Sequence, residues 1–156
     1  MKIEKVELFR VPPRWLFLKM TTSSGLTGWG EPIVEGKAQS VEACVRELTE
    51  QLIGKDATQI EDAFQMLYRG GFYRGGPILT SAISGLEQAM WDIKGKALGV
   101  PVHELLGGKV RDQIEVYRWI GGDHPRNTAE EAKIAISQGY RAVKMNGTDE
   151  LRWIDT

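Results

Sequence analysis

The chain has 156 residues, 42% of them hydrophobic and 26% charged, and its formal net charge is -1. This length suits one domain with a proper core and does not favour a second complete domain. The balanced charge excludes a basic nucleic-acid-binding surface, and no apolar run approaches the ~20 residues that a membrane span needs.

The first residues, MKIEKVELFRV, carry charges where a signal peptide needs its apolar centre. Cys44 is the single cysteine and cannot form an internal disulfide. We therefore expect a cytoplasmic enzyme or binding protein that has neither a nucleic-acid nor a membrane partner.

The N-terminal part predicts a small antiparallel sheet. Ile3 to Val11 is rich in strand-forming residues and ends at Pro12-Pro13, which cannot donate to a strand ladder. Trp15 to Thr22 alternates between a more apolar and a more polar face, and a Ser-Ser-Gly turn leads to a third strand over Leu26 to Pro32. We predict a three-stranded meander with other elements packed against it.

Two helices are predicted after the strands. The first has apolar residues at helical spacing and ends at Gly54; these residues are Val41, Val45, Leu48 and Leu52. Thr58 to Glu61 matches a capping box, which opens a second helix with Ile60, Phe64 and Leu67 on one side.

A long third helix organises this part of the chain. Pro77 suits its first turn, and Gly99 suits its left-handed cap. Its apolar stripe consists of Leu79, Ile83, Leu86, Met90, Ile93 and Ala97. We expect Asp92, inside this helix, to be a hydrogen-bonded structural carboxylate. Strands followed by helices indicate an α+β domain with its helices on one side of the sheet.

The pattern changes after a short helical turn over Pro101 to Leu106. Ile114 to Ile120 and Ala142 to Met145 are predicted strands, and a capping box at Thr128 to Glu131 opens a helix over Ala129 to Gln138 between them. This order predicts one βαβ unit, which builds a parallel sheet, and two parallel strands cannot form a complete domain. We therefore expect an α+β domain followed by the first step of a larger α/β domain.

Several motifs, in this order, resemble the mandelate racemase and muconate-lactonizing branch of the enolase superfamily, and within it the sugar-acid dehydratases. They are PPRWLFLKM at 12–20, GWGEPIVEGKA at 28–38, the glycine-rich run over 71–112, and VKMNG at 143–147. The resemblance implies an enolase-type capping domain over 1–112, followed over 113–156 by the incomplete start of a TIM-type barrel. Such a barrel needs ~250 residues, so the family's cap and barrel together need about 360.

The resemblance also implies a reaction. In it, the proton α to a sugar-acid carboxylate is removed, and the β-hydroxyl is lost from a D-galactonate-like aldonate to give a 2-keto-3-deoxy acid. The enediolate intermediate is stabilised by Mg²⁺. The metal ligands and catalytic histidines of the family would lie beyond this chain, so we expect the chain alone to be inactive and the full-length protein to be a homo-oligomer.

Lys144 is the chemical group of the family's barrel site that this chain retains. Relatives with racemase chemistry carry Lys-x-Lys here, whereas this chain has Lys144-Met145-Asn146. The resemblance therefore implies an auxiliary electrostatic or substrate contact for Lys144, with Asn146 beside it. Without the resemblance, a solvated lysine at a strand end is the favoured interpretation of Lys144, because a lone lysine carries little information.

Other substrate-binding candidates lie in the capping domain. Arg14 and Trp15 follow the double proline in a segment that resembles the family's specificity loop, and Glu35 lies in a second loop. Charged donors and acceptors suit a polyol better than an apolar substrate. Surface charge for Arg14 and Glu35, and strand-edge packing for Trp15, are the alternatives.

Tyr73 and Arg74 stand between paired glycines, which permit tight turns toward a cleft. The alternative is a structural connector, in which Phe72 docks the following helix and Arg74 pairs with a carboxylate. A second hypothesis for the whole chain is a non-catalytic fragment that self-associates, or pairs with a complementary half, through unpaired strand edges.

Overall fold

The computed structural model describes residues 1–121 and 125–145. The chain divides into two compact units, Met1–Lys109 and Val110–Thr156, which we call the sheet–helix unit and the C-terminal unit. No helix in the described part of the chain is both long and apolar enough to cross a lipid bilayer.

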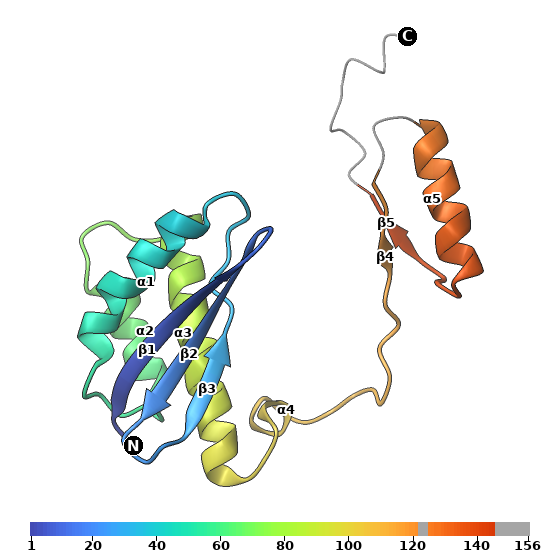
Figure 1. The fold of residues 1–156 in the computed structure, drawn as a ribbon. Coiled ribbons are helices and arrows are strands. Elements are labelled where there is room, and N and C mark those ends of the chain that lie inside the picture. The colour runs from blue at the N-terminus through green and yellow to red at the C-terminus, as the bar shows by residue number, and fades with distance from the viewer. Residues whose placement is uncertain (122–124, 146–156) are drawn as a thin grey trace. The chain divides into compact units, whose positions relative to one another are not determined.

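An antiparallel meander forms one layer of the sheet–helix unit (Figure 1). Its strands, in spatial order, are β1 (Ile3–Val11), β2 (Trp15–Thr22) and β3 (Thr27–Gly30). The first two have the predicted bounds. The third is shorter than the predicted Leu26 to Pro32, because beyond Gly30 the backbone bonds to a helix side chain: the Glu31 N–H donates to Gln88 Oε1 over 2.9 Å.

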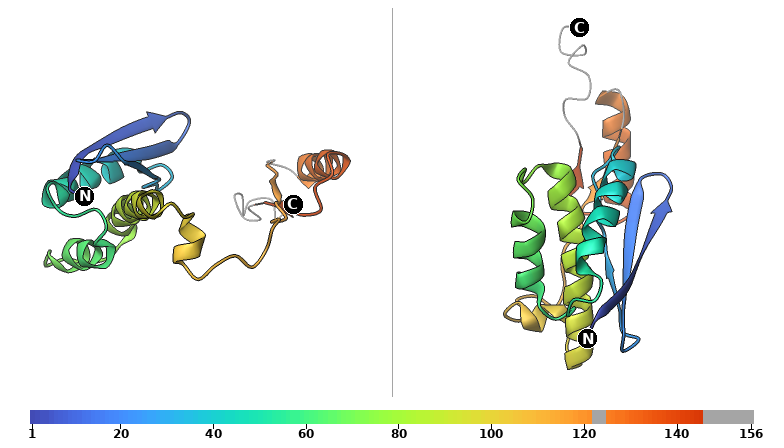
Figure 2. Two further views of the ribbon diagram at one scale, coloured as in Figure 1. Left: turned by 90° about the horizontal axis from the view of Figure 1, so that it is seen from below. Right: turned by 90° about the vertical axis from the view of Figure 1, so that its left-hand side faces the viewer.

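Helices cover one face of this sheet, as the two views of Figure 2 show. They are α1 (Ala38–Leu52), α2 (Ile60–Arg69) and α3 (Pro77–Leu98). The short α4 (Val102–Leu105) follows and packs against α3. Leu16, Leu18 and Met20 point from β2 into the core and are completely buried. The predicted α+β class, with its helices on one side of the sheet, is confirmed.

Helix α3 is buried more widely than a single stripe predicts. Pro77 and Gly99 bound it as expected, and Gly99 adopts the left-handed conformation with φ of 70°. Ala97, however, is exposed. Small residues are buried as well as the large ones, namely Ala82, Gly85, Ala89 and Gly95. The predicted stripe is confirmed at Ile83, Leu86, Met90 and Ile93, and the buried surface is wider than the stripe because α3 packs against β3, α1 and α2 at once.

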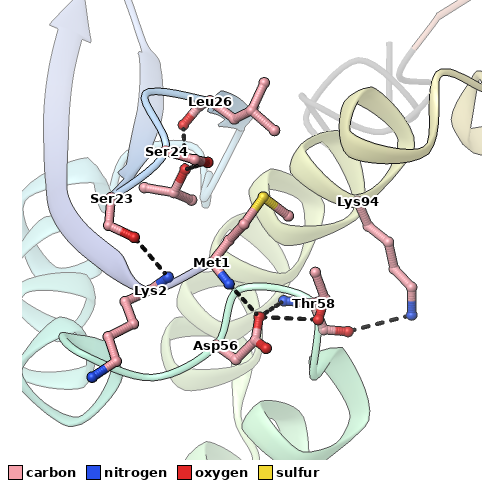
Figure 3. A network of polar contacts seen from close by, with 9 residues as sticks. Met1, Lys2, Ser23, Ser24, Leu26, Asp56, Thr58 and Lys94 are labelled. Carbon is pink, nitrogen blue, oxygen red and sulfur yellow. Dashed lines mark hydrogen bonds and ion pairs between the residues drawn. The ribbon is translucent and has the colours of Figure 1, made fainter.

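The predicted capping box at Thr58 is also wrong. Helix α2 begins after Gln59, which makes no side-chain cap. Instead, the Thr58 amide and hydroxyl both donate to Asp56 Oδ1, each over 3.0 Å. The Met1 amino group lies 3.4 Å from the same oxygen, and Lys94 Nζ donates to the Thr58 carbonyl over 3.3 Å (Figure 3). This network joins the start of the chain, the α1–α2 connection and α3.

The C-terminal unit contains β4 (Arg118–Trp119), α5 (Pro125–Ser137) and β5 (Val143–Lys144). The two strands pair in parallel, with Trp119 opposite Lys144, so the predicted βαβ unit is confirmed. Both strands are shorter than predicted, and Ile114 stays 80% exposed. The second capping box is wrong, because α5 already begins at Pro125 and Thr128 lies inside it.

The Asp56 network predicts a pH-dependent contribution to stability. Hydrogen bonds from the Thr58 amide and hydroxyl lower the pKa of the Asp56 carboxyl. A lowered pKa stabilises the fold above the unfolded-state value, near pH 4, and this stabilisation is lost as the pH falls through the folded pKa. We expect Asp56→Ala to lower Tm by about 3 °C at pH 7.

The difference in Tm between the wild type and Asp56→Ala should shrink when the scans are repeated near pH 3. Glu50→Ala, which removes an exposed acid at the end of α1, is the control and should leave Tm almost unchanged. A difference that persists undiminished at pH 3 would contradict the assignment.

Candidate functional site

Three loops lie at the same end of the sheet–helix unit. They are the β1–β2 turn (12–14), the β3–α1 loop (31–37) and the α2–α3 loop (70–76), which we call the loop end. The views in Figures 1 and 2 agree on this placement: the loop end is opposite the N-terminus. The fold requires it, since β1, β3 and α2 end here while β2, α1 and α3 begin here.

Three of the predicted substrate-binding residues contact one another at the loop end. Arg14 Nη1 lies 3.3 Å from Glu35 Oε1. The Arg14 guanidinium carbon also lies 5.0 Å from the centre of the Trp15 ring, within the range of a cation–π contact. Trp15 in turn stacks against Phe17, with ring centres 6.5 Å apart. The turn and the β3–α1 loop thus form one cluster of a cation, a carboxylate and an aromatic face.

This cluster is accessible to a ligand. The Arg14 and Glu35 side chains are 51% and 68% exposed. An exposed guanidinium can bind a carboxylate through two parallel hydrogen bonds, and a free carboxylate oxygen can accept from a hydroxyl. The arrangement therefore suits a small polar anion that also carries hydroxyl groups.

Helix α3 holds the β3–α1 loop in place. The Ser81 hydroxyl donates to the Ile33 carbonyl over 2.6 Å. Pro32 lies directly on Gly85, where an added Cβ would come within 2.5 Å of the proline ring. Glu35, two residues beyond Ile33, is therefore carried by a loop that is fixed at its base.

The same helix closes the free edge of β3 with a row of side chains at i, i+4 and i+8. Gln88 accepts from the Glu31 amide, and Asp92 Oδ2 accepts from the Trp29 amide over 3.0 Å. Lys96 donates to the Thr27 carbonyl over 2.8 Å and to Asp92 over 2.7 Å. The expectation that Asp92 is a hydrogen-bonded structural carboxylate is confirmed.

The α2–α3 loop presents aromatic side chains to solvent. Phe72 and Tyr73 are 92% and 88% exposed, and their rings meet edge to face at 5.3 Å. The alternative in which Phe72 docks the next helix is therefore wrong. Arg74 reaches back to the Arg69 carbonyl over 3.5 Å and not to a carboxylate.

Tyr73 and Arg74 share the loop end with the Arg14 cluster but do not join it directly. Among the described residues, no hydrogen bond or ion pair connects the two groups. Two consecutive glycines with positive φ, Gly75 and Gly76, follow Arg74, and this conformation lets the chain turn sharply into α3.

Lys144 is the last residue of β5, and its carbonyl accepts a hydrogen bond from the Ile120 amide over 2.9 Å. Its side chain is exposed. Asn146 lies outside the described residues. The roles of both residues stay predictions.

One cluster was not predicted from the sequence. Glu42, in α1, lies between Arg10 of β1 and Arg46 of its own helix, at 2.7 Å from each. The i,i+4 spacing of Glu42 and Arg46 signals the helical half of this cluster. Its cross-element half depends on tertiary packing.

The described residues do not form a metal site. Within 1–121 and 125–145, no group of three or more histidine, cysteine, aspartate or glutamate side chains is placed to hold an ion. The described residues of the loop end therefore do not by themselves fit the Mg²⁺ that the resemblance implies.

The fold and the sequence together define the family. Residues 12–107 match the mandelate racemase / muconate lactonizing enzyme N-terminal domain. The matched part is more than half of the chain, and the chain belongs to this family.

Curated relatives and solved structures agree with this assignment. The chain is 56% identical over 155 residues to a D-galactonate dehydratase of Pectobacterium atrosepticum, an alignment that covers 99% of this chain and 41% of that protein. It is 55% identical over 156 residues to a D-galactonate dehydratase of Ralstonia pickettii, with 100% and 41% covered. The chain thus spans about two fifths of the length of these relatives.

Among solved structures, an enolase from Pantoea ananatis with bound D-gluconate and Mg aligns with a TM-score of 0.82 at 34% identity, covering 97% of this chain and 39% of that one. A member of the enolase superfamily from Salmonella Typhimurium aligns with a TM-score of 0.84 at 32% identity, covering 93% and 42%. The predicted enolase-type N-terminal domain is confirmed.

Strand β3 and helix α3 are so close that a methyl group added between them should strongly destabilise the fold. A Cβ at Gly28 would lie 2.0 Å from the Ala89 carbonyl oxygen, which is backbone and cannot rotate away. We expect Gly28→Ala to lower the free energy of unfolding by roughly 3 kcal/mol, as measured by urea denaturation.

Gly71→Ala is the matched control, because a Cβ there meets its nearest neighbour at an ordinary 3.6 Å. Its unfolding free energy should stay within about 0.5 kcal/mol of the wild-type value. Equal effects of the two substitutions would contradict the tight contact.

Proposed function

We propose that this chain supplies the capping domain and the first barrel βαβ unit of a sugar-acid dehydratase. Its substrate would be a D-galactonate-like aldonate, and its product a 2-keto-3-deoxy acid. The single observation that carries the proposal is the 56% identity, over 99% of the chain, to a D-galactonate dehydratase. The polar and aromatic cluster at the loop end supports it, since a sugar acid is a polyol anion.

The proposed reaction is a β-elimination. A base removes the proton α to the carboxylate, and the electron pair of the broken C–H bond moves toward the carboxylate to give an enediolate. These electrons then form the Cα–Cβ double bond as the β C–O bond breaks, and the hydroxyl leaves as water with a proton from an acid. The resulting enol becomes the 2-keto acid by tautomerisation.

In this proposal, the groups that perform these steps come from the rest of the full-length protein. When bound, Mg²⁺ would supply positive charge next to the developing enediolate, with ligands from elsewhere in the full-length protein. This chain has Lys144-Met145-Asn146 where relatives with racemase chemistry have Lys-x-Lys, so the second lysine is missing. This difference favours a base from elsewhere in the full-length protein. Lys144 then serves as an auxiliary positive charge near the substrate, with Asn146 as a further substrate contact.

In this proposal, the loop end recognises the substrate. Arg14 binds an oxygen-rich part of the anion, Glu35 accepts hydrogen bonds from sugar hydroxyls, and Trp15 packs against the C–H face of the carbon chain. Tyr73 and Arg74 supply further donors from the α2–α3 loop. Hydrogen bonds to the sugar hydroxyls would disfavour analogues that lack a hydroxyl.

The proposal is tested with the full-length protein that contains this sequence. Incubation with D-galactonate and Mg²⁺ should form a 2-keto acid, and removal of the metal with EDTA should abolish the product. D-Gluconate and D-mannonate serve as comparison substrates. No product from any six-carbon aldonate would exclude the class, and the 156-residue chain alone should give no product.

Arg14→Ala in the full-length protein should lower kcat/KM for the aldonate about tenfold, because a hydrogen bond to a charged partner is lost. Steady-state kinetics should show this loss mainly as a higher KM, with a smaller change in kcat. Lys37→Ala removes an exposed cation from the β3–α1 loop and should leave both constants within about twofold. Equal effects of the two substitutions would contradict a specific role for Arg14.

One observation favours the second hypothesis for the isolated chain, self-association or pairing with a complementary half. The two strands of the C-terminal unit and the segments next to them leave large apolar side chains 41–80% exposed, namely Ile114, Val116, Tyr117, Trp119, Val143 and Met145. Such a surface favours association. In the full-length protein the rest of the chain would cover it, and we propose that this protein is a cytoplasmic homo-oligomer.

Size-exclusion chromatography with light scattering checks this second hypothesis. The 156-residue chain should elute as a concentration-dependent oligomer, and Trp119→Ser should shift it toward the monomer, since Trp119 is 56% exposed on this surface. A monomer at every concentration would contradict self-association.

A further inference from the structure

Glu42 bridges the two elements that carry the Arg14–Glu35 pair. Its Oε2 lies 2.7 Å from Arg10 Nε, in β1, and Arg46 Nη2 donates to its Oε1 over 2.7 Å. Arg10 stands four residues before Arg14 on the way into the β1–β2 turn. Glu42 stands seven residues after Glu35, near the start of α1. A single carboxylate thus connects the turn to the helix that follows the β3–α1 loop.

Burial makes this carboxylate dependent on its arginines. The Glu42 side chain is only 15% exposed, whereas those of Arg10 and Arg46 are 55% and 63% exposed. Among the described residues, the buried Oε2 has no directional hydrogen bond, and the Arg10 guanidinium is its close ionic partner. Without Arg10, the buried Oε2 would lose its close ionic partner, and the carboxylate would keep only Arg46, at its other oxygen. Because this loss is unfavourable, the Arg10 contact favours the packing of β1 next to α1.

The Arg14–Glu35 pair lacks such support of its own. Both of its side chains are more than half exposed, and exposed ion pairs hold their geometry weakly. Fixed positions for the two side chains must therefore come from the elements beneath them. The base of the β3–α1 loop is fixed by Ser81, as described above. The Arg10–Glu42 contact provides the corresponding anchor for the β1–β2 turn.

We propose that Glu42 is a positioning residue, which holds the β1–β2 turn so that Arg14 and Trp15 face Glu35. This inference rests on the proposed function, because it assigns the purpose of the anchor to sugar-acid recognition at the loop end. Glu42 itself does not contact the substrate. Its loss acts through Arg14, and the expected signature is weaker substrate binding with little change in the chemical step.

The first measurement is hydrogen–deuterium exchange on the 156-residue chain, which needs no activity. Glu42→Gln keeps the side-chain volume and removes the charge, and it should speed exchange in a peptide that covers the β1–β2 turn. Arg10→Gln should do the same, and because Arg10 is largely exposed this variant keeps the test valid if Glu42→Gln fails to fold. Unchanged exchange in both variants would overturn the proposal.

Two controls separate positioning from a general loss of charge. Arg46→Gln removes the other partner of Glu42 and leaves the contact with Arg10, so the turn should keep its protection. Glu7→Gln breaks an ion pair of 2.8 Å with Lys5 on the same strand, away from the turn. Faster exchange at the turn in either control would overturn the specific role of the Arg10–Glu42 contact.

The second measurement uses the full-length protein and the aldonate on which the wild type acts. Glu42→Gln should raise KM roughly tenfold and leave kcat within about twofold, while Glu7→Gln changes neither. A fall in kcat at unchanged KM would overturn the proposal. If the wild type converts no aldonate, the proposed function fails, and the exchange data still decide whether Glu42 anchors the turn.

Discussion

The rest of the sheet–helix unit depends on the contact between strand β3 and helix α3, where two backbones meet without side chains between them. A Cβ at Gly30 would lie 1.9 Å from the Gly85 carbonyl oxygen, and one at Gly28 would meet Ala89 as closely. Because the strand lies so near, side chains of α3 reach its edge and bond to its free amides and carbonyls. The helix thus replaces a fourth strand, and the edge is closed to pairing with another chain.

This contact also explains where recognition is possible. Helix α3 packs across the sheet, and the connections between elements lie at the two opposite ends of the sheet–helix unit. The loops 12–14, 31–37 and 70–76 all lie at one of these ends. The opposite end is occupied by the Asp56 network, which ties the start of the chain to α2 and α3. The loop end carries exposed charged and aromatic side chains, and within the described residues it has no metal cluster. In the proposed function this end recognises the substrate, and the reaction is left to groups elsewhere in the full-length protein.

The side chains at and beneath the loop end differ in how exposed they are to solvent. Arg14 and Glu35 are open to solvent and free to bind, so they cannot also fix their own positions. Less exposed groups lie beneath them: Ser81 donates to the Ile33 carbonyl of the β3–α1 loop, and Glu42 pairs with Arg10 of β1, the contact that we propose positions the β1–β2 turn. Accessible binding groups on well-anchored segments are a general way to reconcile access with geometry.

The sequence by itself determined the type and order of the elements and the bounds of some of them. Periodicity and the double proline gave the bounds of β1 and β2, Pro77 and Gly99 gave those of α3, and the motifs between 12 and 112 identified the family, because these signals depend on residues close together in the chain. Only the tertiary structure decided the start of α2, the wide burial of α3, and the contacts of Arg14 with Glu35 and of Glu42 with Arg10. Thr58 donates to Asp56 and does not cap α2, and Gly28 and Gly30 lie directly against α3. Both outcomes depend on which distant segment of the chain packs next to these residues.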